Sequence, residues 1–101
     1  MSQISPFLRM TESGPAHWCP GCKEMHVFYV TRPISKGARW TWDGNTVKPT
    51  FSPSMNISCG PWDDGTVDRC HYFLRGGMIQ FLGDCTHELR GQTVALPELP
   101  Q

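Results

Sequence analysis

The chain has 101 residues, of which 39% are hydrophobic and 18% are charged. This length fits one domain, and the composition is too apolar for a disordered chain. Lys and Arg together number nine, as do Asp and Glu, so the zero net charge gives no general electrostatic reason to bind nucleic acid. No apolar run approaches the ~20 residues of a membrane span, and the N-terminus lacks the apolar segment of a signal peptide. We therefore expect one cytoplasmic domain over residues 1–101, without membrane contact.

The first half of the chain predicts three extended segments. The run HVFYVTR at 26–32 has the β-branched and aromatic composition of a strand. The run RWTWD at 39–43 places its two tryptophans on one face, which we expect to fill one side of a sheet, and the following DGN favours a hairpin turn. The return run at 46–58 contains two prolines, which cannot donate to a strand ladder, so it predicts an edge strand or an irregular extended segment.

The second half predicts a hairpin. The runs at 69–75 and 78–82 flank Gly76-Gly77, a two-residue turn typical of paired strands. A short strand is expected at 93–96, and at most one helical turn at 86–90. The expected fold is all-β, either a small antiparallel sheet or a barrel-like meander, with a zinc-ribbon-like metal site.

The most informative motif is Cys19-Pro20-Gly21-Cys22. Two cysteines separated by two residues can bind one tetrahedral zinc ion from a tight turn, as in the knuckle of a zinc ribbon. Lys23 follows the second cysteine, where such knuckles usually have glycine. The alternative is a redox pair, which normally begins a helix, whereas a strand is expected here. With five cysteines and a cytoplasmic location, thiols or metal ligands are expected rather than disulfides.

The remaining ligands are expected from two clusters beside the predicted hairpin, Cys70-His71 and Cys85-Thr86-His87. Pairing of the two hairpin strands would bring both clusters to the same open end. Neighbouring residues of a strand point to opposite faces, so one of each pair is expected to bind Zn²⁺. The candidate ligands are Cys19, Cys22, Cys70, His71, Cys85 and His87.

Some candidates also have a structural interpretation. His71 could be a partly buried histidine that is hydrogen-bonded to Asp84, and Cys70 could be a small buried hydrophobic residue. His26 follows Cys22 by four residues and could add a ligand, although a histidine without a metal role is the favoured interpretation.

The PTFSPS segment at 49–54 combines hydroxyls and prolines. It could present Ser52 and Ser54 to a ligand, but a rigid edge whose hydroxyls cap backbone groups is favoured. No nucleophile–base pair is evident in the sequence, so no catalytic residue is assigned.

Several segments together carry a family resemblance: WCPGCKEMH, KPTFSPSM, RCHYFLRGGMIQFLGDCTH and GQTVALPE. In this combination the chain resembles a family of small phage and prophage proteins. The resemblance implies a phage-encoded origin, hence the host cell cytoplasm, and metal binding. Some members carry the label of ammonia monooxygenase, a membrane copper enzyme, which a chain without membrane spans does not support.

Three functions follow from these features. The leading hypothesis is a zinc-stabilised accessory protein that binds a host or phage macromolecule, with a protein as the expected partner, because a closed four-ligand site leaves no position for water. The alternative is a metal-dependent hydrolase or nuclease-like enzyme with Asp84, His71 and His87 in supporting roles. The third is a nucleic-acid-binding zinc ribbon, which the zero net charge disfavours.

Overall fold

The computed structural model describes residues 2–35 and 37–100, and every regular element within these ranges is a β-strand. The fold is therefore all-β and antiparallel, as the sequence predicts. The strands are β1 (Ser2–Gln3), β2 (Arg9–Met10), β3 (Pro15–Cys19), β4 (Glu24–Val27), β5 (Thr41–Trp42), β6 (Phe51–Ser52), β7 (Met55–Cys59), β8 (Asp68–Arg75), β9 (Met78–Phe81) and β10 (Thr93–Ala95).

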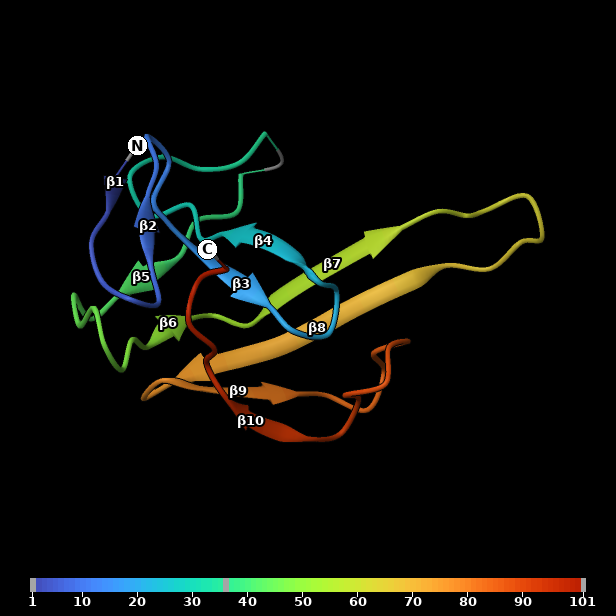
Figure 1. Ribbon diagram of the computed structural model, residues 1–101. Coiled ribbons are helices and arrows are strands. Elements are labelled where there is room, and N and C mark those ends of the chain that lie inside the picture. Colours follow the sequence, from blue (N-terminus) through green and yellow to red (C-terminus); the bar gives the residue numbers. More distant parts are fainter. Residues whose placement is uncertain (1, 36, 101) are drawn as a thin grey trace.

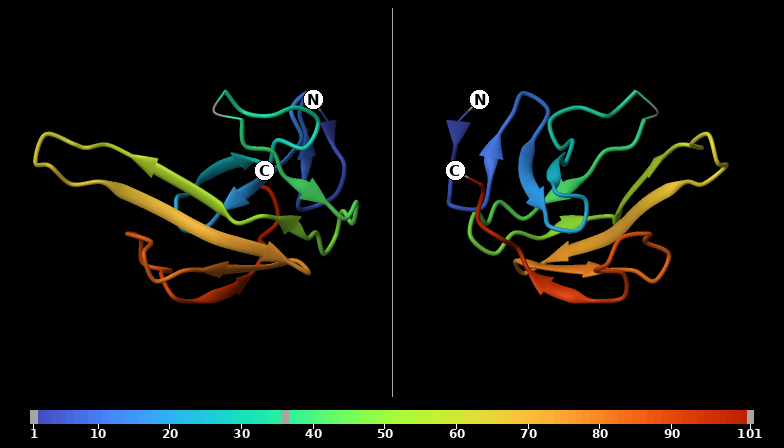
Figure 2. Two further views of the ribbon diagram at one scale, coloured as in Figure 1. Left: turned by 180° about the vertical axis from the view of Figure 1, so that it is seen from behind. Right: turned by 45° about the vertical axis from the view of Figure 1, so that its right-hand side comes forward.

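These strands form two four-stranded sheets, with the orders β1-β2-β3-β4 and β10-β9-β8-β7, and a two-stranded ribbon of β5 and β6. Figure 1 shows the first sheet lying over the second, with the ribbon at one end. The hairpin of β7 and β8 is the longest feature and projects from the body of the molecule, as both views of Figure 2 also show. Within residues 2–35 and 37–100 there is no helix that could span a membrane.

The predicted hairpin around Gly76-Gly77 is confirmed, because β8 pairs with β9 across this turn and both glycines have positive φ. The proline-containing return run is also confirmed as an edge, since β7 is the last strand of its sheet. At 86–90, where at most one helical turn was expected, the structure has a hydrogen-bonded turn and no helix: Arg90 N donates to His87 O.

Two boundaries in the first half also differ from expectation. The strand predicted at 26–32 ends at Val27, and it begins earlier, at Glu24. The hairpin expected at the DGN sequence is formed, since β5 and β6 pair antiparallel, but the connection is not a tight turn. Instead β5 pairs with β6 across a longer loop, in which the Asp43 carboxylate accepts hydrogen bonds from the amides of Asn45 and Thr50.

The core lies between the sheets and is mainly aromatic. Phe28 stacks on Phe51 at a centroid distance of 4.0 Å, and Tyr72 of β8 contacts Phe28 edge to face. Trp40 is buried against Phe28, while Trp42 is half-buried over Phe51. Such contacts stabilise the core beyond the burial of apolar area alone.

Strand β8 separates two faces with different chemistry. Cys70, Tyr72 and Leu74 are buried on the inner face, and alternation directs Arg69 and His71 to the outer face. The inner face therefore meets the cysteine-rich turn between β3 and β4, whereas the outer face of the same strand carries polar side chains.

Candidate active site and metal centre

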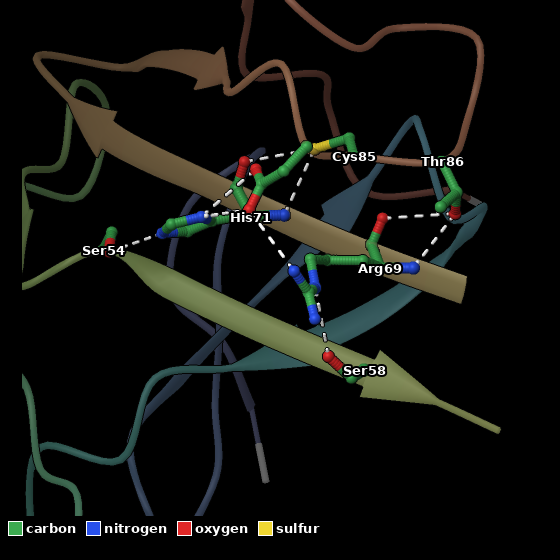
Figure 3. Close-up of polar contacts among 7 residues, drawn as sticks. Ser54, Ser58, Arg69, His71, Cys85 and Thr86 are labelled. Carbon is green, nitrogen blue, oxygen red and sulfur yellow. Dashed lines mark hydrogen bonds and ion pairs between the residues drawn. The ribbon is translucent and has the colours of Figure 1, made fainter. Parts of the chain in front are cut away.

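A serine–histidine contact lies on the outer face where β7 begins. Ser54 Oγ is 3.1 Å from His71 Nε2, although the two residues are 17 positions apart in the sequence (Figure 3). The contact is formed because β7 pairs with β8 in the register that sets Asn56 opposite His71. The carbonyl of Ser54 points away from β8 and accepts a hydrogen bond from Trp40 Nε1 at 3.3 Å, which helps to fix the position of this residue.

The second nitrogen of the same imidazole faces a carboxylate. His71 Nδ1 lies 3.1 Å from Asp84 Oδ2 and 3.3 Å from Asp84 Oδ1. The pKa of Asp84 is lowered, chiefly by the hydrogen bond from His71. With the carboxylate accepting at Nδ1, the neutral imidazole carries its proton there and leaves Nε2 as an acceptor for the Ser54 hydroxyl. Ser54, His71 and Asp84 are thus connected in the order of a serine nucleophile, a general base and an orienting carboxylate.

The loop after β9 runs alongside β8 and is hydrogen-bonded to it, which places Asp84 beside His71. Leu82 N donates to His71 O, and the amide of His71 donates to the thiol of Cys85 at 3.2 Å. Thr86 N donates to Arg69 O, and Arg69 N donates to Thr86 Oγ1 (Figure 3). These contacts flank Asp84 on both sides, so its position is fixed by backbone pairing.

Arg69 is the charged neighbour of this site. Its Nη1 lies 3.7 Å from Asp84 Oδ2, and its Nε donates to Ser58 Oγ at 3.4 Å. Both Arg69 and Asp84 are about half exposed, with side-chain exposures of 44% and 43%, so water screens the ion pair and its effect on stability is small.

The hydrogen bond predicted between His71 and Asp84 is confirmed. The sequence analysis missed the role of Ser54 as the partner of His71. One signal was available: Ser54 follows Pro53 at the start of an edge strand, and the His71 strand was expected to be nearby. The register that joins them depends on a pairing that was not predicted.

The inner face gathers a second cluster, in which thiols and imidazoles lie close enough to share one ion. Cys22, Cys70 and His87 form one such group, and Cys19, Cys22 and His26 form another. Cys19 Sγ lies 3.8 Å from Cys70 Sγ, and His87 Nε2 lies 3.4 Å from Cys70 Sγ. Two sulfur ligands at ~2.3 Å from a tetrahedral zinc ion lie about 3.8 Å apart, and a sulfur and a nitrogen ligand about 3.5 Å apart. The spacing of these side chains therefore fits a tetrahedral metal site.

The Cys19–Cys22 turn has the geometry of a metal-binding knuckle. Lys23 N donates to Cys19 O, and Cys22 N points at Cys19 Sγ at 3.4 Å. Lys23 has a φ of 56°, which explains why glycine is usual at this position. A Cβ at Gly21 would collide with the ring of His87, so this glycine allows the imidazole to approach the turn.

The thiols of this cluster compete for one negative charge. A hydrogen bond with Cys70 lowers the pKa of Cys19 to about 6. Burial and the charge on Cys19 raise the pKa of Cys22 to about 12. The hydrogen bond with Cys19 likewise raises the pKa of Cys70. A bound cation would remove this competition, because metal ions bind the thiolate form of each ligand.

His26 adds a fifth donor, and its orientation follows from a buried chain of hydrogen bonds. His17 Nδ1 donates to Trp18 O, so His17 Nε2 accepts from the Tyr72 hydroxyl at 2.6 Å. The Tyr72 oxygen then accepts from His26 Nδ1 at 3.0 Å. This order leaves His26 Nε2 with a lone pair, buried and without a hydrogen-bond partner among the described residues. His26 lies within ligand distance of Cys19 and Cys22, and its Nε2 is 3.7 Å from Glu24 Oε1. A free imidazole lone pair beside two thiols is what a metal-binding histidine needs.

The structure thus separates the sequence-predicted ligands. Cys19, Cys22, Cys70 and His87 lie together, whereas His71 and Cys85 lie outside both groups, His71 bound to Ser54 and Asp84 and Cys85 bound to the backbone of His71. His26, for which no metal role was favoured from the sequence, lies beside the cluster. The fifth cysteine, Cys59, is exposed.

Comparison with known proteins gives one match. No curated protein and no solved structure matches the chain. A family model described as BubE, the serine protease of a bacterial ubiquitination-like system, matches residues 4–82. The matched range includes Ser54, His71 and the three cysteines of the cluster, and it ends before Asp84 and His87. Because the match extends over well more than half of the sequence, the chain belongs to the BubE family.

Proposed function

We propose that the protein is a serine peptidase in which Ser54, His71 and Asp84 form the catalytic triad. The observation that carries this proposal is the pair of contacts made by one imidazole, with Nε2 at 3.1 Å from Ser54 Oγ and Nδ1 at 3.1 Å from Asp84 Oδ2. The matching family is described as a serine protease, which supports the same chemistry.

The reaction follows from these contacts. Ser54 Oγ attacks the carbonyl carbon of a peptide bond while its proton passes to His71 Nε2. The imidazolium gives that proton to the leaving amine, and the acyl group remains as an ester on Ser54. Water then attacks the ester with His71 as base, which releases the acid and restores the serine. Asp84 holds the tautomer of His71 and stabilises its charged form.

The negative oxygen of the tetrahedral intermediate needs a donor, and Asn56 is well situated to supply one. It lies two residues after Ser54, on the same face of β7, and directly opposite His71. Its side chain is exposed, so its amide group is free to reach a substrate oxygen above the sheet. A side-chain amide that donates to the oxyanion contributes a factor of ~100 to 1000 in kcat in serine proteases.

The cysteine cluster would hold a structural zinc ion. Thiolate-rich sets with one imidazole favour zinc over harder cations. Cys19, Cys22 and Cys70 with His87 would fill a tetrahedral site, and His26 is the competing fourth ligand. A closed site of this kind stabilises the fold and carries no reaction. Cys70 immediately precedes His71 in β8, so the ion would fix the strand that carries the catalytic base.

This proposal differs from the expectations drawn from the sequence. The leading expectation of a binding module was based on a closed metal site and on the lack of an evident nucleophile–base pair in the sequence. The Ser54–His71 contact supports such a pair. Of the three residues expected to support a metal-dependent hydrolase, His87 lies in the cluster, whereas His71 and Asp84 lie on the opposite face of β8. Partner binding, a phage origin and nucleic-acid binding stay predictions.

The experiment is a cleavage assay on the full chain with zinc bound, using a mixture of fluorescence-quenched octapeptides. Ser54→Ala and His71→Ala should each lower kcat by at least about a thousandfold, because the serine and the base act as one unit. Ser52→Ala is the matched control, since Ser52 is exposed in the neighbouring β6, and it should keep full activity. Undiminished cleavage by Ser54→Ala would refute the proposal.

A further inference from the structure

The free edge of β7 begins immediately after the proposed nucleophile. In the second sheet β7 is the terminal strand, and β8 is its only strand neighbour among the described residues. The β7–β8 hairpin projects from the body of the molecule (Figure 1), and Asn56, Ser58 and Cys59 of β7 are exposed. Exposed edges of this kind pair readily with another extended chain.

The backbone groups that face the open side can be identified from the pairing. His71 O accepts from Leu82 N, and Arg69 O accepts from Thr86 N, so these two residues direct their backbone groups away from β7. In an antiparallel ladder the residues opposite them therefore direct their groups away from β8. These residues are Asn56 and Ser58.

At the end of the β7 edge nearest the nucleophile, the outward backbone carbonyl already has a hydrogen-bond donor. The Ser54 carbonyl points to the same open side and is bonded to Trp40 Nε1 at 3.3 Å. The backbone groups that are free to pair with another strand thus start at Asn56, two residues after Ser54. Strand β7 contains neither proline nor lysine. The edge therefore lacks two of the features that usually prevent pairing with another strand.

From this arrangement we infer that β7 binds the substrate by strand addition. An extended peptide pairs with the backbone of Asn56 and Ser58, and this pairing carries a peptide carbonyl to Ser54 Oγ. The inference rests on the proposed peptidase function and names its substrate class: flexible, extended segments of polypeptide, recognised largely through their backbone. Folded helices and small esters do not use this edge.

The inner side of the same edge offers side-chain selectivity. Ile57, Cys59 and Trp62 form part of a pocket of about 380 Å³, which is also lined by Cys22, Cys70 and His87 of the metal cluster. Side chains of an added strand alternate between the two faces. Those on the outer face meet Ser54 and His71, and those on the inner face meet this pocket. Trp62 is 51% exposed, so it can cover an apolar side chain on that face.

The first test leaves the protein unchanged. The octapeptide that is cleaved fastest from the mixture is resynthesised with a single N-methyl group at each position in turn. Strand addition predicts that kcat/KM falls about tenfold or more at every second position and little at the positions between, because alternate amides face β7. A profile without this alternation would overturn the inference.

The second test changes the edge. Ser58→Pro removes an amide that faces the open side and that the β8 ladder does not use, a change tolerated on edge strands. It should lower kcat/KM for the peptide by at least about tenfold. Val67→Pro, at an exposed position of the same hairpin outside both strands, is the matched control and should keep full activity. Labelling of Ser54 by a small fluorophosphonate should be equal in both variants, since this reagent needs no strand pairing.

The two proposals fail in different ways. Normal labelling with full peptide cleavage by Ser58→Pro would overturn strand addition and leave the triad intact. No labelling and no cleavage by the unchanged protein would overturn the proposed function, and strand addition with it.

Discussion

Replacing Tyr72 by phenylalanine removes the single oxygen atom that joins two buried histidines. The hydroxyl lies 2.6 Å from His17 Nε2 and 3.0 Å from His26 Nδ1, and all three side chains are buried. The phenylalanine ring fills the same space, but neither nitrogen can reach water. A buried polar group left without a partner costs ~1–3 kcal/mol, so two such groups cost about 2–6 kcal/mol. This is a large share of the ~5–15 kcal/mol by which a typical domain is stable.

Protonation does not offset this loss near neutral pH. Burial lowers the pKa of His17 to about 3, and it also lowers the pKa of His26, so both rings stay neutral. The assay is urea unfolding of the zinc-loaded protein, followed by tryptophan fluorescence. Tyr29→Phe is the matched control, because the Tyr29 hydroxyl has no hydrogen-bond partner among the described residues. A Tyr72→Phe variant as stable as the Tyr29→Phe variant would refute the buried chain of hydrogen bonds.

Three further predictions concern the metal site, the oxyanion and pH. Gly21→Ala should weaken zinc binding, because the new methyl group collides with the ring of His87; zinc affinity measured by competition with a chelator tests this, and unchanged affinity would exclude His87 from the site. Asn56→Ala should lower kcat by about a hundredfold with little change in KM; an unchanged kcat would assign the oxyanion to another donor. Acid should destabilise the fold through His17, whose pKa falls from 6.5 to about 3 on folding. Its stabilising contribution is complete above pH 6.5 and is lost as the pH falls toward 3, at about 1.4 kcal/mol per pH unit, because only the unfolded chain takes up the proton. Unfolding free energies that stay constant between pH 6.5 and 5 would contradict this.

The parts of the fold that were predicted from sequence are those with local signals. Gly76-Gly77 between two β-branched and aromatic runs was sufficient to identify the β8–β9 hairpin. Prolines in the return run identified an edge strand. The two-residue strands β1 and β2 were missed, since their formation depends on the pairing of β1 with β2 and of β2 with β3, and not on their own composition.

The candidate site divides in the same way. The Cys19–Cys22 turn carries its chemistry within four residues, so its metal-binding character is visible in the sequence. The Ser54–His71 contact depends on the register of β7 against β8, and a shift by one residue would turn Ser54 to the other face. The choice between Cys70 and His71 was left open for the same reason. The choice is decided by the face of β8 that meets the Cys19–Cys22 turn. That face is set by the packing of the two sheets.

The central claim, that Ser54 is an activated nucleophile, is tested most directly by mapping the adduct of a fluorophosphonate on the zinc-loaded protein by mass spectrometry. The account predicts a single adduct on Ser54, which disappears in His71→Ala and persists in Ser52→Ala. An unlabelled protein, or an adduct on Ser52 or Ser58 in place of Ser54, would contradict it.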